Sequence, residues 1–253
     1  MHAALELTES NPLSKLRFLE LSVPAANVLN SLTFFQQLGF TSIHTNDIWN
    51  YPYGVISDGR CFIGLHDANH YQVTGEHPRL SFVHEHVAPL LNGLQDSDFS
   101  VLHAETDEDR FQHASLKGID NIPLHIMAAR SFSPPSGHQR KDSLLGYFRG
   151  VVLLTANLHK AEKFWNDVGL LVMPIEEEQC LMVSSNRLNM LLLEKNASDQ
   201  CGLLFEHPQP ESLFAQFARF GITLKVGEDD LVLGSEYQFR TPDGMPIWIR
   251  REA

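Results

Sequence analysis

Four copies of one supersecondary pattern constrain the fold of this chain more than any other feature. Residues 17–40 (RFLELSVPAANVLNSLTFFQQLGF) align without gaps on residues 147–170 (YFRGVVLLTANLHKAEKFWNDVGL). The match includes an Ala-Asn pair, two adjacent aromatic residues and a glycine near the end of each segment. Repeated segments of this kind indicate a fold assembled from one unit used several times.

A second pair of segments supports the duplication independently. Residues 79–84 (RLSFVH) align on 202–207 (GLLFEH), and the same offset places 120–126 (DNIPLHI) on 243–249 (DGMPIWI). Because one offset holds at both ends of a long segment, chance similarity is a poor explanation. The chain is therefore predicted to consist of four related units.

Each unit is predicted to form a strand, a helix and three further strands. In the first unit, residues 17–25 alternate in polarity, residues 28–38 have the apolar spacing of one helix face, and Gly39 is a helix stop signal. Further strands of this unit are expected near 40–45, 51–57 and 61–66. The second unit is expected to contain a strand at 79–84, a helix at 87–95 and strands near 99–104, 110–116 and 123–129. Units three and four span 147–195 and 201–251.

The units pair into two domains of an α+β protein built from four βαβββ modules. The segment SFSPPSGHQRKDSL, residues 131–144, is predicted to be a linker because it is rich in Pro, Ser and Gly and has no apolar periodicity. We expect the domains to span the following ranges: 14–130, with modules 14–70 and 77–130, and 145–253, with modules 145–197 and 200–253. Each domain should form an open half-barrel sheet with helices outside, and the concave face is the natural pocket.

Charge and cysteine content limit the class of partner. The formal net charge is −12, and the Lys and Arg residues form no cluster, so we expect neither nucleic acid nor an anionic membrane as a partner.

The three cysteines are widely spaced and form no CxxC motif, which favours a reducing compartment. Glu6 and Glu9 interrupt the N-terminal segment where a secretory signal needs an apolar run. We therefore expect a cytoplasmic protein.

The repeated signature resembles the vicinal oxygen chelate superfamily, which includes glyoxalase I, extradiol dioxygenases and bleomycin-resistance proteins. The resemblance rests on FFQQLGF and FWNDVGL, where the family has an aromatic pair before its helix stop, and on TPDGMPIWIR, which is similar to the closing strand of the family. It covers nearly the whole chain and implies two glyoxalase-like domains. It leaves the function open, because this fold supports lyases, dioxygenases, epimerases and metal-free drug binders.

The resemblance also implies which positions would carry the metal ligands of metal-dependent members. In the first domain, the aligned positions are Glu20, Gly64, Arg79 and His125. In the second domain, they are Gly150, Leu192 or Glu194, Gly202 and Trp248. Only the first domain keeps a titratable cluster. Trp248 is expected to fill a mostly apolar concavity, which suits packing or a flat aromatic ligand.

The preferred hypothesis is a metal-independent protein that binds a small anionic or aromatic ligand in the first domain. Arg79 would pair with an acidic oxygen of the ligand, and Glu20 and His125 would supply acid–base groups if a reaction is catalysed. The tract NDIWNYPYG is expected to border the pocket and to stack on an aromatic ligand through Trp49, Tyr51 and Tyr53. No cofactor is expected under this hypothesis.

Two alternatives remain open. In the first, Glu20, His66 and His125 bind one divalent metal ion (Fe, Mn, Ni or Zn), and the protein is a glyoxalase-like lyase or an extradiol-type, ring-cleaving dioxygenase. Against this, a fixed guanidinium at Arg79 raises the electrostatic cost of binding a cation. In the second, Glu20 and Arg79 form a buried ion pair, and the protein is a non-catalytic interaction scaffold. The sequence is compatible with a monomer or a homodimer.

Overall fold

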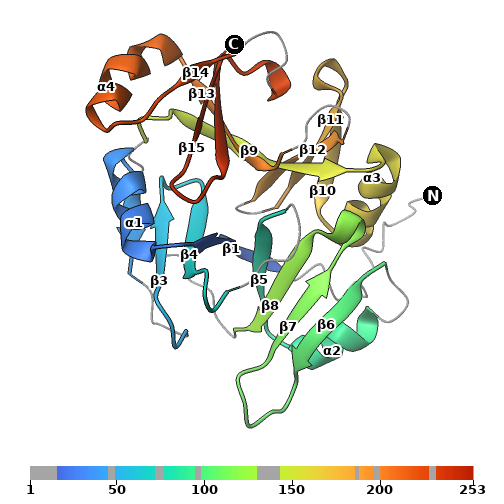
Figure 1. Ribbon diagram of the computed structural model, residues 1–253. Helices are drawn as coiled ribbons and strands as arrows, with labels where there is room; N and C mark the ends of the chain where they lie inside the picture. Colours follow the sequence, from blue (N-terminus) through green and yellow to red (C-terminus); the bar gives the residue numbers. More distant parts are fainter. Residues whose placement is uncertain are drawn as a thin grey trace, which may run out of the picture.

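The computed structural model describes residues 16–44, 49–71, 77–94, 98–129, 143–185, 188–195, 200–227 and 232–252. Within them the chain forms two eight-stranded mixed sheets, shown in Figure 1. We call residues 16–129 the first half and residues 143–252 the second half. The predicted linker, 131–144, lies outside the described residues except for its last two positions, so the domain boundaries stay a prediction.

The elements of the two halves follow one another in the predicted order. The first half contains β1 (Arg17–Ala25), α1 (Val28–Gln37), β2 (Thr41–Ile43), β3 (Tyr53–Ser57), β4 (Phe62–Asp67), β5 (Arg79–His84), α2 (Val87–Gly93), β6 (Ser100–Glu105), β7 (His113–Lys117) and β8 (Pro123–Ala128). The second half contains β9 (Tyr147–Thr155), α3 (Leu158–Asp167), β10 (Leu171–Ile175), β11 (Cys180–Ser184), β12 (Asn189–Glu194), β13 (Gly202–His207), α4 (Leu213–Arg219), β14 (Lys225–Val226), β15 (Tyr237–Arg240) and β16 (Pro246–Arg251).

The two sheets have the same topology. Their strand orders are β2-β3-β4-β1-β5-β8-β7-β6 and β10-β11-β12-β9-β13-β16-β15-β14. In each sheet the first strands of two units pair antiparallel at the centre, and each of them pairs parallel with the last strand of its own unit. This arrangement confirms the predicted α+β fold of paired βαβββ units with open sheets.

The repeated Ala-Asn pair starts a helix in both halves. The Oδ1 atoms of Asn27 and Asn157 accept hydrogen bonds from the backbone N–H groups three residues on, at 3.0 and 2.9 Å, which satisfies one otherwise unpaired donor of α1 and α3. Gly39 and Gly169 end these helices with φ angles of 90° and 86°, a conformation that favours glycine. No helix among the described residues is long and apolar enough to cross a membrane.

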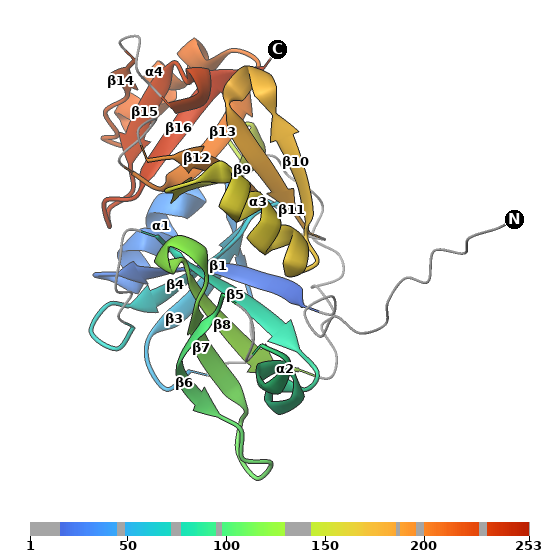
Figure 2. The same ribbon diagram turned by 90° about the vertical axis from the view of Figure 1, so that its right-hand side faces the viewer.

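Two aspartates connect the halves reciprocally at these helix starts. Asp243, in the turn before β16, accepts hydrogen bonds from the Ala26 N–H (2.8 Å) and the Ser31 hydroxyl (2.5 Å), at the first turn of α1. Asp120, before β8, accepts one from the Ala156 N–H (3.1 Å), at the start of α3. Figure 2 shows the halves stacked, with α1 and α3 at the level where they meet. The turn of each half thus holds the segment that leads into a helix of the other half.

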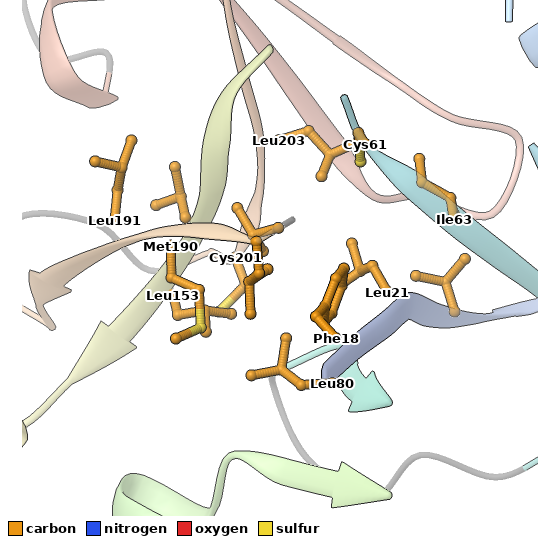
Figure 3. Close-up of a cluster of buried hydrophobic side chains, with 14 of the residues drawn as sticks. Phe18, Leu21, Cys61, Ile63, Leu80, Leu153, Met190, Leu191, Cys201 and Leu203 are labelled. Atoms are coloured by element: carbon orange, nitrogen blue, oxygen red, sulfur yellow. The ribbon is translucent and has the colours of Figure 1, made fainter. Parts of the chain in front are cut away.

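The buried apolar side chains form one cluster that extends through both halves. Figure 3 shows Phe18, Leu21 and Leu80 of the first sheet facing Leu153 and Leu203 of the second. Each of these side chains is at most 2% exposed. One face of the first sheet is therefore used for packing, which leaves the opposite face for a polar site.

Candidate functional site

The polar residues of the first half lie in one row across its sheet. Glu20 on β1 is directly opposite Ser81 on β5, Ser81 is opposite His125 on β8, and His125 is opposite Ser115 on β7. Directly opposed residues of neighbouring strands point to the same face. Strand register therefore brings Glu20 and His125 to one face although they are far apart in the sequence.

Glu20 is buried and fully engaged by neighbouring side chains. Its Oε1 lies 2.9 Å from Nε2 of His66 and accepts a hydrogen bond from the Ser22 hydroxyl at 2.8 Å. Its Oε2 accepts a hydrogen bond from the Tyr53 hydroxyl at 2.5 Å. The side chain of Glu20 is 2% exposed and that of His66 is fully buried. Both carboxylate oxygens thus have partners inside the protein, as a buried charge requires.

Gly64 on β4 makes room for this carboxylate. A Cβ atom at Gly64 would lie 2.1 Å from Oε1 and 2.4 Å from Oε2 of Glu20. The resemblance aligned this position with a metal ligand of metal-dependent members. Here the Glu20 carboxylate fills the space that a side chain at Gly64 would occupy.

Aromatic rings surround the Glu20–His66 pair. The Tyr51 hydroxyl lies 3.1 Å from Nδ1 of His66, and the ring of Tyr71 stacks on the His66 imidazole with centroids 4.2 Å apart. Burial raises the pKa of Tyr51 to about 12, so its hydroxyl stays protonated. The Trp49 ring lies 5.3 Å from His66. The structure therefore brings Trp49, Tyr51 and Tyr53 together at the predicted site.

Arg79 contributes a positive charge to the polar face of the first sheet. It is directly opposite Ser22 in the sheet, and its guanidinium carbon lies 4.2 Å from the ring centroid of Tyr71. Such an arrangement is a cation–π interaction, which holds the guanidinium in place without removing its charge. The positive charge of Arg79 also disfavours protonation of His125.

His125 is a neutral imidazole in a buried position. Its Nδ1 lies 3.1 Å from the Ser115 hydroxyl, whereas its Nε2 is buried and has no hydrogen-bond partner in the part of the chain that the structure describes. Burial lowers the pKa of His125 to about 3, and the charge of Arg79 contributes further. His125 therefore offers an uncharged ring nitrogen to this face at neutral pH.

The Trp49 ring is close to both His66 and His125. Its ring centroid is 5.3 Å from His66 and 6.0 Å from His125, and the side chain is half-buried. The His113 ring contacts His125 from the other side, with centroids 5.4 Å apart. The result is an aromatic lining above a row of polar groups.

The donor set does not fit a divalent metal ion. The described ranges contain no group of three or more His, Cys, Asp and Glu side chains that could hold one. Glu20 and His66 contact each other directly, and the Arg79 charge raises the cost of a nearby cation. The predicted ligand set of Glu20, His66 and His125 is therefore not assembled as a metal site.

Several site residues were missed by the sequence argument. These are Ser22, Tyr71, Ser81, His113 and Ser115. Ser22 had a usable signal, since it is two residues from Glu20 on the same strand. No sequence signal identifies the other four residues, because their place in the site depends on the strand register.

In the second half, the positions equivalent to Glu20, Arg79 and His125 carry no titratable side chain, although Glu206 and Arg250 form an ion pair further along the same face. Trp248 is 2% exposed, and a Cβ atom at Gly202 would lie 2.5 Å from its ring atom Cζ3. The indole thus covers the position equivalent to Arg79. Trp248 belongs to a packed interior, separate from the polar row of the first half.

The sheet register corrects one alignment in the third unit. Val152 is opposite Leu191, as Ser22 is opposite Gly64 in the first half. The residue equivalent to Gly64 is therefore Leu191, and the prediction of Leu192 or Glu194 was wrong. Leu191 has an aliphatic side chain without a donor atom, so this position also carries no ligand.

Comparison with known proteins identifies relatives in structure only. No family model and no curated protein sequence matches the chain. Among solved structures, the 2,3-dioxygenase LapB from Pseudomonas sp. KL28 matches with a TM-score of 0.55 at 12% identity, covering 94% of this chain and 92% of that one. A catechol 2,3-dioxygenase matches with a TM-score of 0.54 at 13% identity, covering 93% and 87%.

A third similar structure contains a small molecule. It is a variant of homoprotocatechuate 2,3-dioxygenase from B. fuscum in complex with HPCA, with a TM-score of 0.60 at 11% identity, covering 93% of this chain and 71% of that one. At such identities the likeness concerns the fold. The chain therefore shares the fold of these 2,3-dioxygenases, in agreement with the duplicated βαβββ pattern of its sequence.

Proposed function

We propose that the first half binds a small aromatic compound with an acidic oxygen, such as a phenol or an aromatic carboxylate, without a metal ion. The observation that carries this proposal is the contrast between two buried groups. Glu20 is occupied by three side chains of the protein, whereas Nε2 of His125 has no partner among the described residues. A buried polar atom without a partner is costly unless a ligand or water satisfies it.

The charges and rings near His125 favour that ligand class. Arg79 contributes to the low pKa of His125, so the potential there is positive, and a positive potential stabilises an anionic oxygen. Neutral imidazole can donate or accept one hydrogen bond through Nε2, which suits a phenol or a carboxylate. The half-buried Trp49 ring adds a flat apolar surface for an aromatic ring.

Tryptophan fluorescence provides a direct test. Trp165 and Trp248 are 0% and 2% exposed, whereas Trp49 is half-buried beside the proposed ligand position. We expect saturable fluorescence changes with phenols or aromatic carboxylates, with HPCA among the compounds tested. A parallel rise in thermal stability should appear with the same compounds.

Variants locate the binding. Arg79→Gln should weaken binding by about tenfold or more, the equivalent of roughly 1.4 kcal/mol or more. Arg110→Gln is the matched control, because Arg110 belongs to the same half and its side chain is 68% exposed. The proposal would be wrong if no compound bound, or if both variants bound equally well.

A metal-dependent lyase or ring-cleaving dioxygenase remains the second candidate, supported by the fold of the similar structures. Its test is elemental analysis after dialysis against Fe(II), Mn(II), Ni(II) or Zn(II), followed by removal of loosely bound ions. We expect no stoichiometric metal. About one metal per chain, lost in His125→Ala, would replace our proposal with this one.

A non-catalytic scaffold is the third candidate. It predicts no stabilisation by any small acid or phenol, so the thermal measurements above also test it.

For the protein itself we propose a cytoplasmic location, which is supported by three cysteines that form no disulfide with one another. A monomer and a homodimer are both compatible with this function.

A further inference from the structure

A cavity of 380 Å³ lies between the two halves, away from the polar row. The first half contributes Val23, Phe35 and Leu65 to its wall, and the second half contributes Met245 and Pro246. Val23 and Leu65 directly follow residues of the polar face on their strands, so they point to the opposite face of the sheet. This cavity is therefore separate from the site proposed above, and the inference below does not depend on that site.

A thiol and an imidazole meet at the wall of this cavity. The Sγ atom of Cys201 lies 3.1 Å from Nδ1 of His77, and both residues line the cavity. The two side chains are 8% and 4% exposed. Cys201 directly precedes β13 and His77 lies just before β5, so the pair exists only when both halves are in place.

The other two cysteines have acidic neighbours. The thiol of Cys180 donates a hydrogen bond to Oε2 of Glu178 at 3.7 Å. Burial is the main cause that raises the pKa of Cys180 to about 12, and the Glu178 carboxylate is the second. Burial, with a further contribution from Asp58, raises the pKa of Cys61 well above its ordinary value. A carboxylate disfavours the thiolate, whereas an imidazole can accept the thiol proton. Cys201 is thus the cysteine placed for nucleophilic chemistry.

We propose that the cavity is a second small-molecule site, in which Cys201 adds covalently to an uncharged α,β-unsaturated carbonyl compound with His77 as the base. The thiol proton moves to His77, and the sulfur electron pair forms an S–C bond to the β-carbon. The C=C pair shifts to give an enolate, and the α-carbon then takes the proton back from His77. The step needs no oxidant, reductant or second reactant.

The cavity selects the ligand by size and polarity. Ligand pockets are typically about 300–1,000 Å³, so 380 Å³ corresponds to a compound of one ring or a short chain. The apolar wall favours an uncharged compound. Arg240 and Asp243 are also in the lining, and their opposite charges leave the cavity without a net charge that would attract an ion.

The first test uses the unaltered protein and N-ethylmaleimide, an uncharged ring with an activated C=C bond. Limited labelling of the native chain followed by peptide mass spectrometry should show Cys201 modified at least about tenfold faster than Cys61 and Cys180. A maleimide attached to a large polymer should not label native Cys201, because the cavity is too small. Equal labelling of the three cysteines, or labelling of Cys201 by the polymer, would overturn the proposal.

The second test separates the role of His77 from simple access. His77→Asn keeps a hydrogen-bonding group near the position of Nδ1 but has no basic nitrogen, so labelling of Cys201 should slow roughly 10- to 100-fold. His159→Asn is the control, since His159 is 92% exposed on α3. Labelling at the unaltered rate in a folded His77→Asn protein would refute the pairing. If that variant does not fold, the comparison of the three cysteines remains decisive.

Discussion

Replacing Gly64 with alanine should destabilise the protein by disrupting the Glu20 network. The added Cβ would lie 2.1 Å from Oε1 of Glu20, and contacts of a Cβ atom below 3.0 Å essentially do not occur in proteins. The carboxylate must therefore move away. Its contacts of 2.9 Å with His66 and 2.8 Å with Ser22 would not survive that displacement.

The size of the effect follows from these contacts. A hydrogen bond to a charged group contributes about 1.5–3 kcal/mol, so losing two of them costs about 3–6 kcal/mol. For a chain of this size, each kcal/mol corresponds to a change in Tm of about 2–4 °C. We therefore expect Gly64→Ala to lower the free energy of unfolding by about 4 kcal/mol and the Tm by on the order of 10 °C.

Urea unfolding measures this change, and Gly54→Ala is the matched control. A Cβ at Gly54, on the neighbouring strand β3, would lie 3.1 Å from the end of the Leu32 side chain, which can shift at little cost. Both substitutions restrict the unfolded chain equally. If Gly64→Ala and Gly54→Ala differed by less than about 1 kcal/mol, the argument for a fixed carboxylate over Gly64 would fail.

A double substitution isolates the clash. Once Glu20 is replaced by alanine, the added Cβ at position 64 meets no carboxylate. In the Glu20→Ala background, Gly64→Ala should then lower the free energy of unfolding only slightly. The double variant should therefore be much more stable than the sum of the two single effects predicts. Additive effects would show that Gly64→Ala acts through some other contact.

Three further predictions concern the helix caps and His125. Asp243→Ala should lower the free energy of unfolding by about 1 kcal/mol, measured in urea, because the start of α1 loses its partners at Ala26 and Ser31. The pKa of His125 is about 3 when folded and 6.5 when unfolded, so the unfolded state binds more protons between these values and stability falls as pH decreases from about 6.5. His125→Gln should remove this component, so unfolding free energies at pH 7 and pH 5 should differ less than in the unaltered protein. Arg79→Gln should raise the pKa of His125 measured by NMR titration, although burial will still hold it below 6.5.

The duplicated topology was predictable because the repeats carry turn chemistry as well as polarity. Apolar spacing placed the first helix at 28–38, and in the structure the repeated residues Asn27 and Asn157 cap the two equivalent helices. Gly39 likewise ended its helix as expected. Local signals of this kind depend only on neighbouring residues, so they can be detected in one sequence.

Register and long-range contacts were harder to predict. The run Met-Leu-Leu-Leu at 190–193 is buried on both faces and shows no alternation, so it could not distinguish Leu191 from Leu192. The contact between Glu20 and His66 depends on the absence of a side chain at Gly64, and no sequence motif indicates that the Glu20 carboxylate occupies this space. The Cys201–His77 pair joins residues 124 positions apart, just before two equivalent strands, and the repeat alone does not indicate that these residues contact each other.

Asp120 and Asp243 each accept hydrogen bonds from the other half, so the second half supports the structure of the first half although it contributes no side chain to the polar site. Residues 16–129 alone would lose the acceptor for the Ala26 N–H at the start of α1, and the apolar face around Leu21 would be exposed to water. We therefore expect the two halves to unfold together as one cooperative unit. Fragments cut between them should recover their structure by reassembling with each other, so the second half can support the site of the first half without contributing a side chain to it.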